Sequence, residues 1–293
     1  MAHDTPEIDP VTKTATTGHI WDGIRELNTP LPRWWLWLFY ATIIWSVGYW
    51  IVYPAWPLVS SYTTGVLDWH SRQAVVSELS ALKAQRDPMV ERINAASLQQ
   101  IASDPALLDF ARAQGRAAFV ENCAPCHGAG GGGARSYPNL NDDDWIWGGK
   151  LDDIVQTIRH GVRSGDSDAR QSPAMPAFGR DGMLKRADIE LIADYVRSLS
   201  NLPVAANADL AAGKKLFLAN CALCHGEDGK GNRELGAANL TDAVWLYGSS
   251  KAAIVESIWN GRGGVMPAWA GRLDDATIKA LAVYVYSFGG GEN

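Results

Sequence analysis

Two short motifs constrain the fold of this chain more than any other feature of its sequence. Cys123-Ala124-Pro125-Cys126-His127 and Cys221-Ala222-Leu223-Cys224-His225 share the pattern C-x-x-C-H, the attachment signature of a c-type haem. Two residues between the thiols let one helical turn present both sulfurs to one edge of the porphyrin, and the adjacent histidine becomes the proximal iron ligand. A redox disulfide or half a zinc site would not need that histidine.

The chain has four cysteines, and all of them lie in these motifs. We therefore predict two covalently bound c haems. The attachment residues are Cys123, Cys126, Cys221 and Cys224, and His127 and His225 are iron ligands.

The two motifs lie in two copies of an internal repeat. Each copy is predicted to contain a helix leading into the motif, a loop, a middle helix, a methionine loop and a closing helix. Equivalent positions include Phe119 and Phe217, Trp145 and Trp245, Gly161 and Gly261, and Tyr195 and Tyr284. A copy of roughly 90 residues is small for a self-sufficient core, so the haem would supply the missing apolar centre. The sequence predicts two tandem cytochrome c domains, 106–202 and 207–293, with a linker at 201–207.

Each copy also contains a methionine followed by proline and alanine, at Met175 and Met266. A single methionine more often packs in a core than binds a metal. Two at equivalent positions after two haem motifs instead favour axial iron ligands, and thioether ligation raises the reduction potential of a haem. The simplest pairing is within each copy, His127 with Met175 and His225 with Met266. A crossed pairing between the copies stays open at this stage.

One apolar segment near the N-terminus predicts a membrane anchor. Residues 34–67 contain no charged side chain and no histidine. About 20 helical residues span about 30 Å, the thickness of the hydrocarbon core, and Trp and Tyr gather at both ends as interfacial anchors do. A buried core helix or a signal peptide is the alternative, but 33 residues precede the segment and no small-residue cleavage site follows it. We predict one transmembrane helix at 34–54.

The regions on either side of this helix differ in character. Residues 1–33 predict a mostly irregular tail in which a short helix could form near 21–27. Residues 55–105 predict a helical connector, in which Asp87-Pro88 and Asp104-Pro105 resemble helix starts. The connector has apolar residues at three- and four-residue steps. That apolar stripe could face the protein's own core or a partner subunit.

Haem attachment fixes the expected topology. Bacteria attach haem c outside the cytoplasm, so the region after the helix is expected in the periplasm and the tail in the cytoplasm. The predicted fold is mainly α: one transmembrane helix in the bacterial inner membrane followed by two tandem cytochrome c domains. A net charge of −6 gives no indication of nucleic acid binding.

Other residues give weaker signals. His160 has Asn260 as its counterpart, so we expect a surface or haem-edge residue, and His70 is expected to be solvated. Trp145 and Trp245 are expected near the haem or in the core. The acidic run 142–144 predicts a solvated loop, and steering of a basic donor cytochrome is the alternative.

The order of these segments resembles a known family. Residues 22–35, Asp-Gly-Ile-Arg-Glu-Leu-Asn-Thr-Pro-Leu-Pro-Arg-Trp-Trp, look like the membrane entry of the dihaem subunit III of cbb3-type cytochrome c oxidases. Both haem motifs and both Met-Pro pairs fit as well. The resemblance covers nearly the whole chain, and the segment before the membrane is its most specific part.

The resemblance implies a role in respiration. Electrons would enter from a donor cytochrome c and pass to a monohaem subunit and then to the haem-copper catalytic subunit, which reduces oxygen and pumps protons. No oxygen chemistry is expected on this chain. The alternatives are a membrane-bound dihaem cytochrome for another reductase or a photosynthetic centre, and a dihaem peroxidase with one open haem position.

Overall fold

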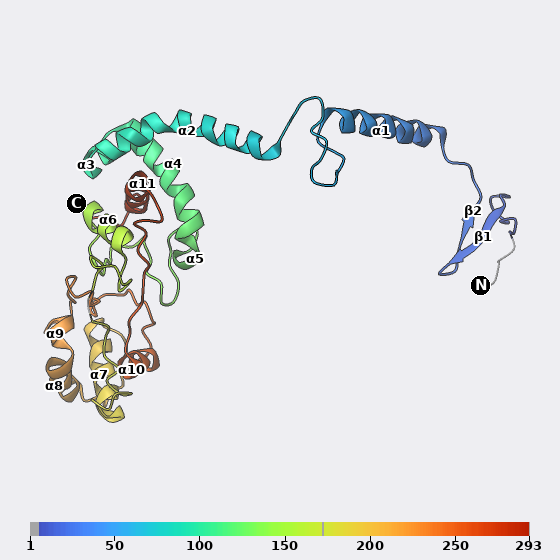
Figure 1. The fold of residues 1–293 in the computed structure, drawn as a ribbon. Helices are drawn as coiled ribbons and strands as arrows, with labels where there is room; N and C mark the ends of the chain where they lie inside the picture. The colour runs from blue at the N-terminus through green and yellow to red at the C-terminus, as the bar shows by residue number, and fades with distance from the viewer. Residues whose placement is uncertain (1–5, 172, 293) are drawn as a thin grey trace. The chain divides into compact units, whose positions relative to one another are not determined.

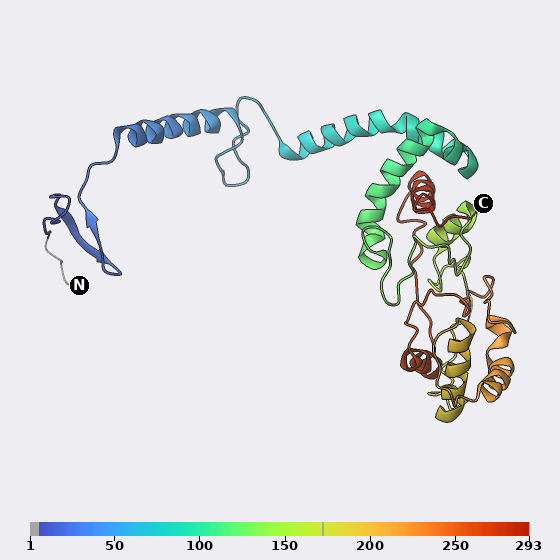
Figure 2. The ribbon, with the colours of Figure 1, turned by 180° about the vertical axis from the view of Figure 1, so that it is seen from behind.

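A computed structural model describes residues 6–171 and 173–292 and divides the chain into two compact units, Met1–Ala84 and Gln85–Asn293. Figure 1 shows the elements of each unit, and Figure 2 shows them from behind. Most of the regular elements are helices, so the predicted fold class is confirmed.

The first unit begins with a β-hairpin. Strand β1 (Thr16–Trp21) pairs antiparallel with β2 (Ile24–Leu27). The short helix predicted near 21–27 is therefore wrong. Asp22 and Gly23 both have positive φ angles, 50° and 84°, which suits a two-residue hairpin turn. This Asp-Gly pair between β-forming residues was a usable hairpin signal in the sequence.

Helix α1 (Arg33–Val52) follows the hairpin. It is long and apolar enough to cross a membrane, it is the one such helix among the described residues, and none of its side chains is buried in the protein. Pro32 precedes it and Pro54 follows shortly after its end. Its bounds lie close to the predicted 34–54.

Helix α2 (Ser71–Ala95) runs continuously through Pro88. The helix start predicted at Asp87-Pro88 is therefore wrong. Proline removes one backbone hydrogen bond without preventing the helix from continuing. The later residues Met89, Val90 and Ile93 keep helical spacing and pack in a core of the second unit.

The apolar stripe of the connector has two different surroundings. Ile93, Leu98 and Ile101 are buried, so this part faces the protein's own core. Four earlier side chains are instead about half exposed or more: Val75, Val76, Leu79 and Leu82.

The second unit contains the remaining helices. They are α3 (Leu98–Ser103), α4 (Pro105–Asn122), α5 (Ala124–His127), α6 (Leu151–His160), α7 (Arg186–Leu199), α8 (Leu210–Asn220), α9 (Ala222–His225), α10 (Lys251–Asn260) and α11 (Asp275–Tyr286). Asp104 caps α4 by accepting hydrogen bonds from the N–H groups of Ala106 and Leu107. The helix start predicted at Asp104-Pro105 is confirmed.

These helices form two modules that do not follow the order of the repeats. Module A consists of α4, α5, α6 and α11, and module B of α7, α8, α9 and α10 (Figure 1). The closing helix α11 of the second copy packs on the leading helix α4 of the first. Gly115 permits this close approach, because a Cβ there would lie 2.3 Å from the Ala280 carbonyl oxygen.

The closing helix α7 of the first copy packs on α8 in the same way. A Cβ on Gly213 would lie 2.4 Å from the Leu191 carbonyl oxygen. Module B is thus one continuous stretch inserted between two parts of module A. The boundaries 106–202 and 207–293 describe the sequence repeats but not the packed modules, and 201–207 is a loop within module B. The chain instead crosses between modules in two segments, one at 161–171 and 173–174 and the other at 261–265, which are called the crossing segments below.

Candidate haem-binding sites

Both C-x-x-C-H motifs begin where a leading helix ends. Cys123 caps the C-terminus of α4, and its carbonyl oxygen accepts hydrogen bonds from the N–H groups of Cys126 (3.1 Å) and His127 (2.9 Å). Cys221 forms the same bonds with Cys224 and His225 at 3.1 and 2.9 Å. One short helical turn therefore holds two thiols and an imidazole together in each module.

The two histidines are oriented by the same kind of hydrogen bond. His127 Nδ1 lies 3.0 Å from the carbonyl oxygen of Pro138, and His225 Nδ1 lies 2.9 Å from that of Ala238. Donation from Nδ1 leaves Nε2 as the atom that can bind a metal. Burial also lowers the pKa of His225, which favours the neutral imidazole that a metal requires.

The first thiol of each motif has low reactivity toward oxidation and disulfide exchange. Burial, and to a lesser degree the neighbouring cysteine, raises the pKa of Cys123 and of Cys221 to about 11. Both sulfurs are therefore protonated at neutral pH, and this disfavours disulfide exchange and oxidation.

The methionines lie in the module opposite to the one that the simplest pairing requires. Met266 packs in the module A core with Cys123, and Met175 packs in the module B core with Cys221. The structure thus brings together the residues of the crossed pairing and not those of the within-copy pairing.

Backbone pairing fixes each methionine in this place. Met266 and Val162 exchange two hydrogen bonds of 3.0 Å, and Met175 and Arg262 exchange bonds of 2.8 and 3.2 Å. A Cβ on Gly161 would lie 2.3 Å from the Met266 carbonyl oxygen. Gly261 has the same relation to Met175, so the two equivalent glycines make both crossings possible.

Each module therefore gathers the donor set that a c-type haem needs. Two thiols, an imidazole with a free Nε2 and a thioether lie around one apolar core. The aromatic and aliphatic residues around module A's set are Leu140, Trp145 and Trp269, and those around module B's are Leu240, Trp245 and Trp259. These residues fit a haem with one histidine and one methionine ligand.

Comparison with known families agrees with this chemistry. Residues 13–60 match the family described as the N-terminal domain of cytochrome oxidase-cbb3, FixP. Residues 110–196 and 208–285 match the family described as cytochrome c oxidase, cbb3-type, subunit III. The chain belongs to the subunit III family of cbb3-type cytochrome c oxidases.

Several relatives of this subunit are similar over their full length. A cbb3-type cytochrome c oxidase subunit FixP of Bradyrhizobium diazoefficiens is 58% identical over 289 residues, which cover 99% of both chains. The FixP subunit of Azorhizobium caulinodans is 60% identical over 294 residues, 99% of this chain and 98% of the other. The CcoP subunit of Azospirillum brasilense is 49% identical over 98% and 99%. The predicted family is therefore confirmed, and the chain is a membrane-anchored cytochrome c subunit of an oxidoreductase complex.

The residues with weaker sequence signals are not members of the two donor sets. His160 Nδ1 lies 3.0 Å from Asp166 Oδ1, in the crossing segment that follows α6. His70 lies 3.4 Å from Asp68 and is partly exposed. Trp145 packs in module A, and its indole N–H donates to the carbonyl oxygen of Gly290 at 2.5 Å.

The acidic run 142–144 is less solvated than predicted. Burial raises the pKa of Asp144 to about 6, with further increases from Asp242 and Asp142 and an opposing effect of Arg233. The Asp144 carboxylate therefore lies at the contact between the modules. Asp242, the equivalent of Asp142 in the second copy, lies close to the run 142–144 there.

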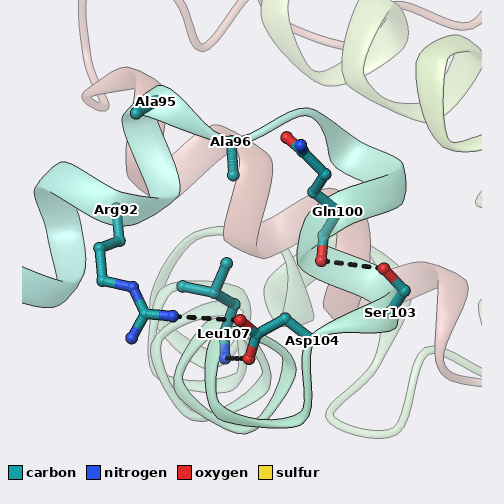
Figure 3. Close-up of a pocket in the computed structure, with 7 residues that line it drawn as sticks. All are labelled: Arg92, Ala95, Ala96, Gln100, Ser103, Asp104 and Leu107. Atoms are coloured by element: carbon teal, nitrogen blue, oxygen red, sulfur yellow. Dashed lines mark hydrogen bonds and ion pairs between the residues drawn. The ribbon is translucent and has the colours of Figure 1, made fainter.

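A surface hollow of about 590 Å³ lies where the end of α2, α3 and the start of α4 meet. Its lining residues are Arg92, Ala95, Ala96, Gln100, Ser103, Asp104 and Leu107 (Figure 3). The Arg92 guanidinium forms an ion pair with Asp104 at 3.1 Å. The lining contains no thiol, imidazole or thioether, so the hollow is part of neither haem site.

The carbonyl acceptors Pro138 and Ala238 are the site residues that sequence reasoning missed. Each directly precedes an Asn-Leu pair, Asn139-Leu140 and Asn239-Leu240, that recurs in both copies. The recurrence marked the position, but a backbone acceptor leaves no side-chain signature.

Proposed function

We propose that this subunit accepts electrons from a donor cytochrome c and passes them, through two covalently bound c haems, toward the monohaem subunit and the haem-copper catalytic subunit. That catalytic subunit would reduce oxygen and pump protons. The observation that carries the proposal is the presence of one complete donor set in each module.

The axial ligands proposed are His127 with Met266 in module A and His225 with Met175 in module B. Cys123, Cys126, Cys221 and Cys224 would form the thioether links. When bound, each haem supplies a site for one electron. The protein's part is to hold the imidazoles through Pro138 and Ala238 and to hold the thioethers through backbone pairing, so that little rearrangement accompanies a change in charge.

The proposed topology places the N-terminus in the cytoplasm and the haem modules in the periplasm. It is supported by helix α1, whose side chains are all open to lipid or to partner helices, and by the need to attach haem c outside the cytoplasm. The exposed apolar residues of α2 support contact with another subunit, since such a row is costly to leave in water.

Family membership argues against a role with another reductase or a photosynthetic centre. A thioether in both donor sets argues against a peroxidase, which needs an open haem position.

The role is tested by extracting the complex from its native membrane in mild detergent. Haem b and copper should accompany haem c, and the complex should consume oxygen with reduced cytochrome c. Isolation of haem c alone, without oxygen uptake under gentler extraction, would contradict the proposal.

The ligand pairing is tested in the full-length chain carrying Cys221→Ala and Cys224→Ala, which attaches only the module A haem. There Met266→His should lower the reduction potential, because histidine replaces a ligand that raises it. Met175→His in the same chain should leave the potential unchanged. The reverse pattern would establish pairing within each copy.

A further inference from the structure

The two modules meet through the loops that hold their histidines. The histidine loops, 128–140 in module A and 226–240 in module B, each contain the carbonyl acceptor of their own histidine. Each loop also contacts the opposite module, through a residue two positions before its carbonyl acceptor. The N–H of Ser136 donates to the carbonyl oxygen of Leu246 at 3.0 Å, and Gly236 lies against the indole of Trp147.

Ion pairs also join each histidine loop to the opposite module. Arg135 of the module A loop lies 3.4 Å from Glu256 on α10, and Arg233 of the module B loop lies 2.6 Å from Glu292 after α11. Arg135 and Arg233 are equivalent positions of the repeat, so the contact is close to symmetric.

The contact between Trp147 and Gly236 breaks this symmetry. A Cβ on Gly236 would lie 2.1 Å from the indole Cζ2 atom, and Gly236 has a φ angle of +58°. Trp147 therefore rests directly on the main chain two residues before Ala238, the acceptor of His225. On the module A side, the guanidinium groups of Arg163 and Arg170 each lie 6.0 Å from the centre of the Trp147 ring.

The guanidinium groups are themselves anchored. Arg163 Nε donates to the carbonyl oxygen of Gly264 at 2.8 Å, and Arg170 forms a 3.0 Å ion pair with Asp153. Arg163, Arg170 and Gly264 all lie in the crossing segments. The indole is thus held between these segments and the module B histidine loop.

We propose that Trp147 is a positioning residue for electron exchange between the two haems. This rests on the proposed function and specifies the part of the relay between the modules. Each proximal histidine is one hydrogen bond from a loop that contacts the opposite module, so the contact joins the two iron ligands by a short path. In the exchange, one electron leaves the ferrous iron of one module, which becomes ferric, and the ferric iron of the other module becomes ferrous. No proton or atom is transferred, and Trp147 is neither oxidised nor reduced.

Two variants of the full-length, dihaem protein test this role. Trp147→Leu removes the ring, and Gly236→Ala forces the ring away from the loop. After a pulse that reduces fewer than half of the haems, absorbance at wavelengths assigned by redox titration gives the rate of electron redistribution. Both variants should slow electron redistribution on the order of tenfold, because a displacement of about 1 Å in a positioning group can reduce a rate by a large factor. Both midpoint potentials and the haem content should stay at their wild-type values.

The repeat supplies matched controls. Tyr247→Leu changes the residue equivalent to Trp147, whose ring lies under Arg262 at 4.2 Å. Gly182→Ala places a methyl group at a φ of +72° with no other atom within 4 Å, so it reproduces the backbone strain alone. Both controls should keep the wild-type rate.

Wild-type redistribution in both test variants would overturn the proposal. So would a loss of haem or shifted potentials, because the side chain would then support the fold rather than the transfer. Failure of the proposed function would be visible earlier, as a wild-type chain lacking two histidine–methionine haems.

Discussion

The two modules use opposite chemistry at one equivalent pair of positions. In module A, Leu151 of α6 and Val283 of α11 are 8% and 2% exposed and pack in one apolar core with residues of α2, α3 and α4. In module B the same positions are Lys251 and Asp194, which form a 2.6 Å ion pair. Lys251 is nearly half exposed there.

The difference follows from what covers each module. The connector places Ile93, Leu98 and Ile101 on module A, so that face became part of a core. Among the described residues, no helix of the connector covers the equivalent face of module B. There Asp194 is only 8% exposed, and its carboxylate is paired with Lys251, whose side chain is 45% exposed. Burial by a neighbouring element, rather than the repeat itself, thus decides the chemistry of this face.

A second asymmetry anchors the connector. Lys279 Nζ donates to the carbonyl oxygens of Asn94 at 2.8 Å and Ala96 at 2.9 Å, close to the end of α2. A cation at a helix C-terminus is favourable because it complements the helix dipole. The equivalent residue in module B, Glu190, instead pairs with Arg186 on the surface.

Exchanging the residues of the first pair should have the largest effect. Leu151→Lys buries an unpaired ammonium group under the connector and should destabilise the protein by about 3–5 kcal/mol. The reciprocal change in module B, Asp194→Val with Lys251→Leu, should alter stability by less than about 1 kcal/mol. Thermal unfolding of the full-length holoprotein in detergent measures both. Equal effects would show that the connector does not govern this face.

The acidic contact between modules should give a smaller, pH-dependent effect. The pKa of Asp144 is about 6 in the folded protein against an ordinary value of 3.8. Between these values the folded state binds more protons, so stability should fall as pH rises through this window and stay lower above it. Asp144→Asn should remove this component and raise stability at neutral pH by about 1 kcal/mol, since the group is half-buried.

The comparison with module B provides the control for this prediction, because Val244 occupies the equivalent position. Melting temperatures at about pH 5 and about pH 7.5 measure the pH dependence. Val244→Asn should leave it unchanged. Identical pH profiles for the wild type and Asp144→Asn would assign the dependence to other groups.

The closing helices should show the smallest difference. Asp274 caps α11 by accepting a 2.7 Å hydrogen bond from the N–H of Thr277, whereas Lys185 at the equivalent end of α7 makes no side-chain cap. Asp274→Ala should cost about 1 kcal/mol, and Lys185→Asp should add up to about 1 kcal/mol. Chemical denaturation of the holoprotein measures both changes. A stabilising Asp274→Ala variant would contradict the assignment of the cap.

Much of the molecule was predictable because its signals are local. The two haem motifs each occupy five consecutive residues, the membrane helix has no charged residue after Arg33, and the Asp104 cap lies next to the helix that it starts. The hairpin was missed although Asp22-Gly23 is a local signal too. The run through Pro88 was missed for a different reason, since packing of Ile93 and its neighbours favours continuation of a helix that proline alone would weaken.

The sequence by itself determined the haem motifs, the apolar membrane helix and the number of cytochrome repeats. Short motifs, hydropathy and repetition are properties of neighbouring residues or of direct alignment. Only the tertiary structure decided which closing helix packs on which leading helix, and hence which module core contains which methionine. Both copies present the same apolar pattern and the same glycine, Gly115 or Gly213, so either partner would fit locally. The choice depends on how the crossing segments connect the modules, and that is a property of the whole fold.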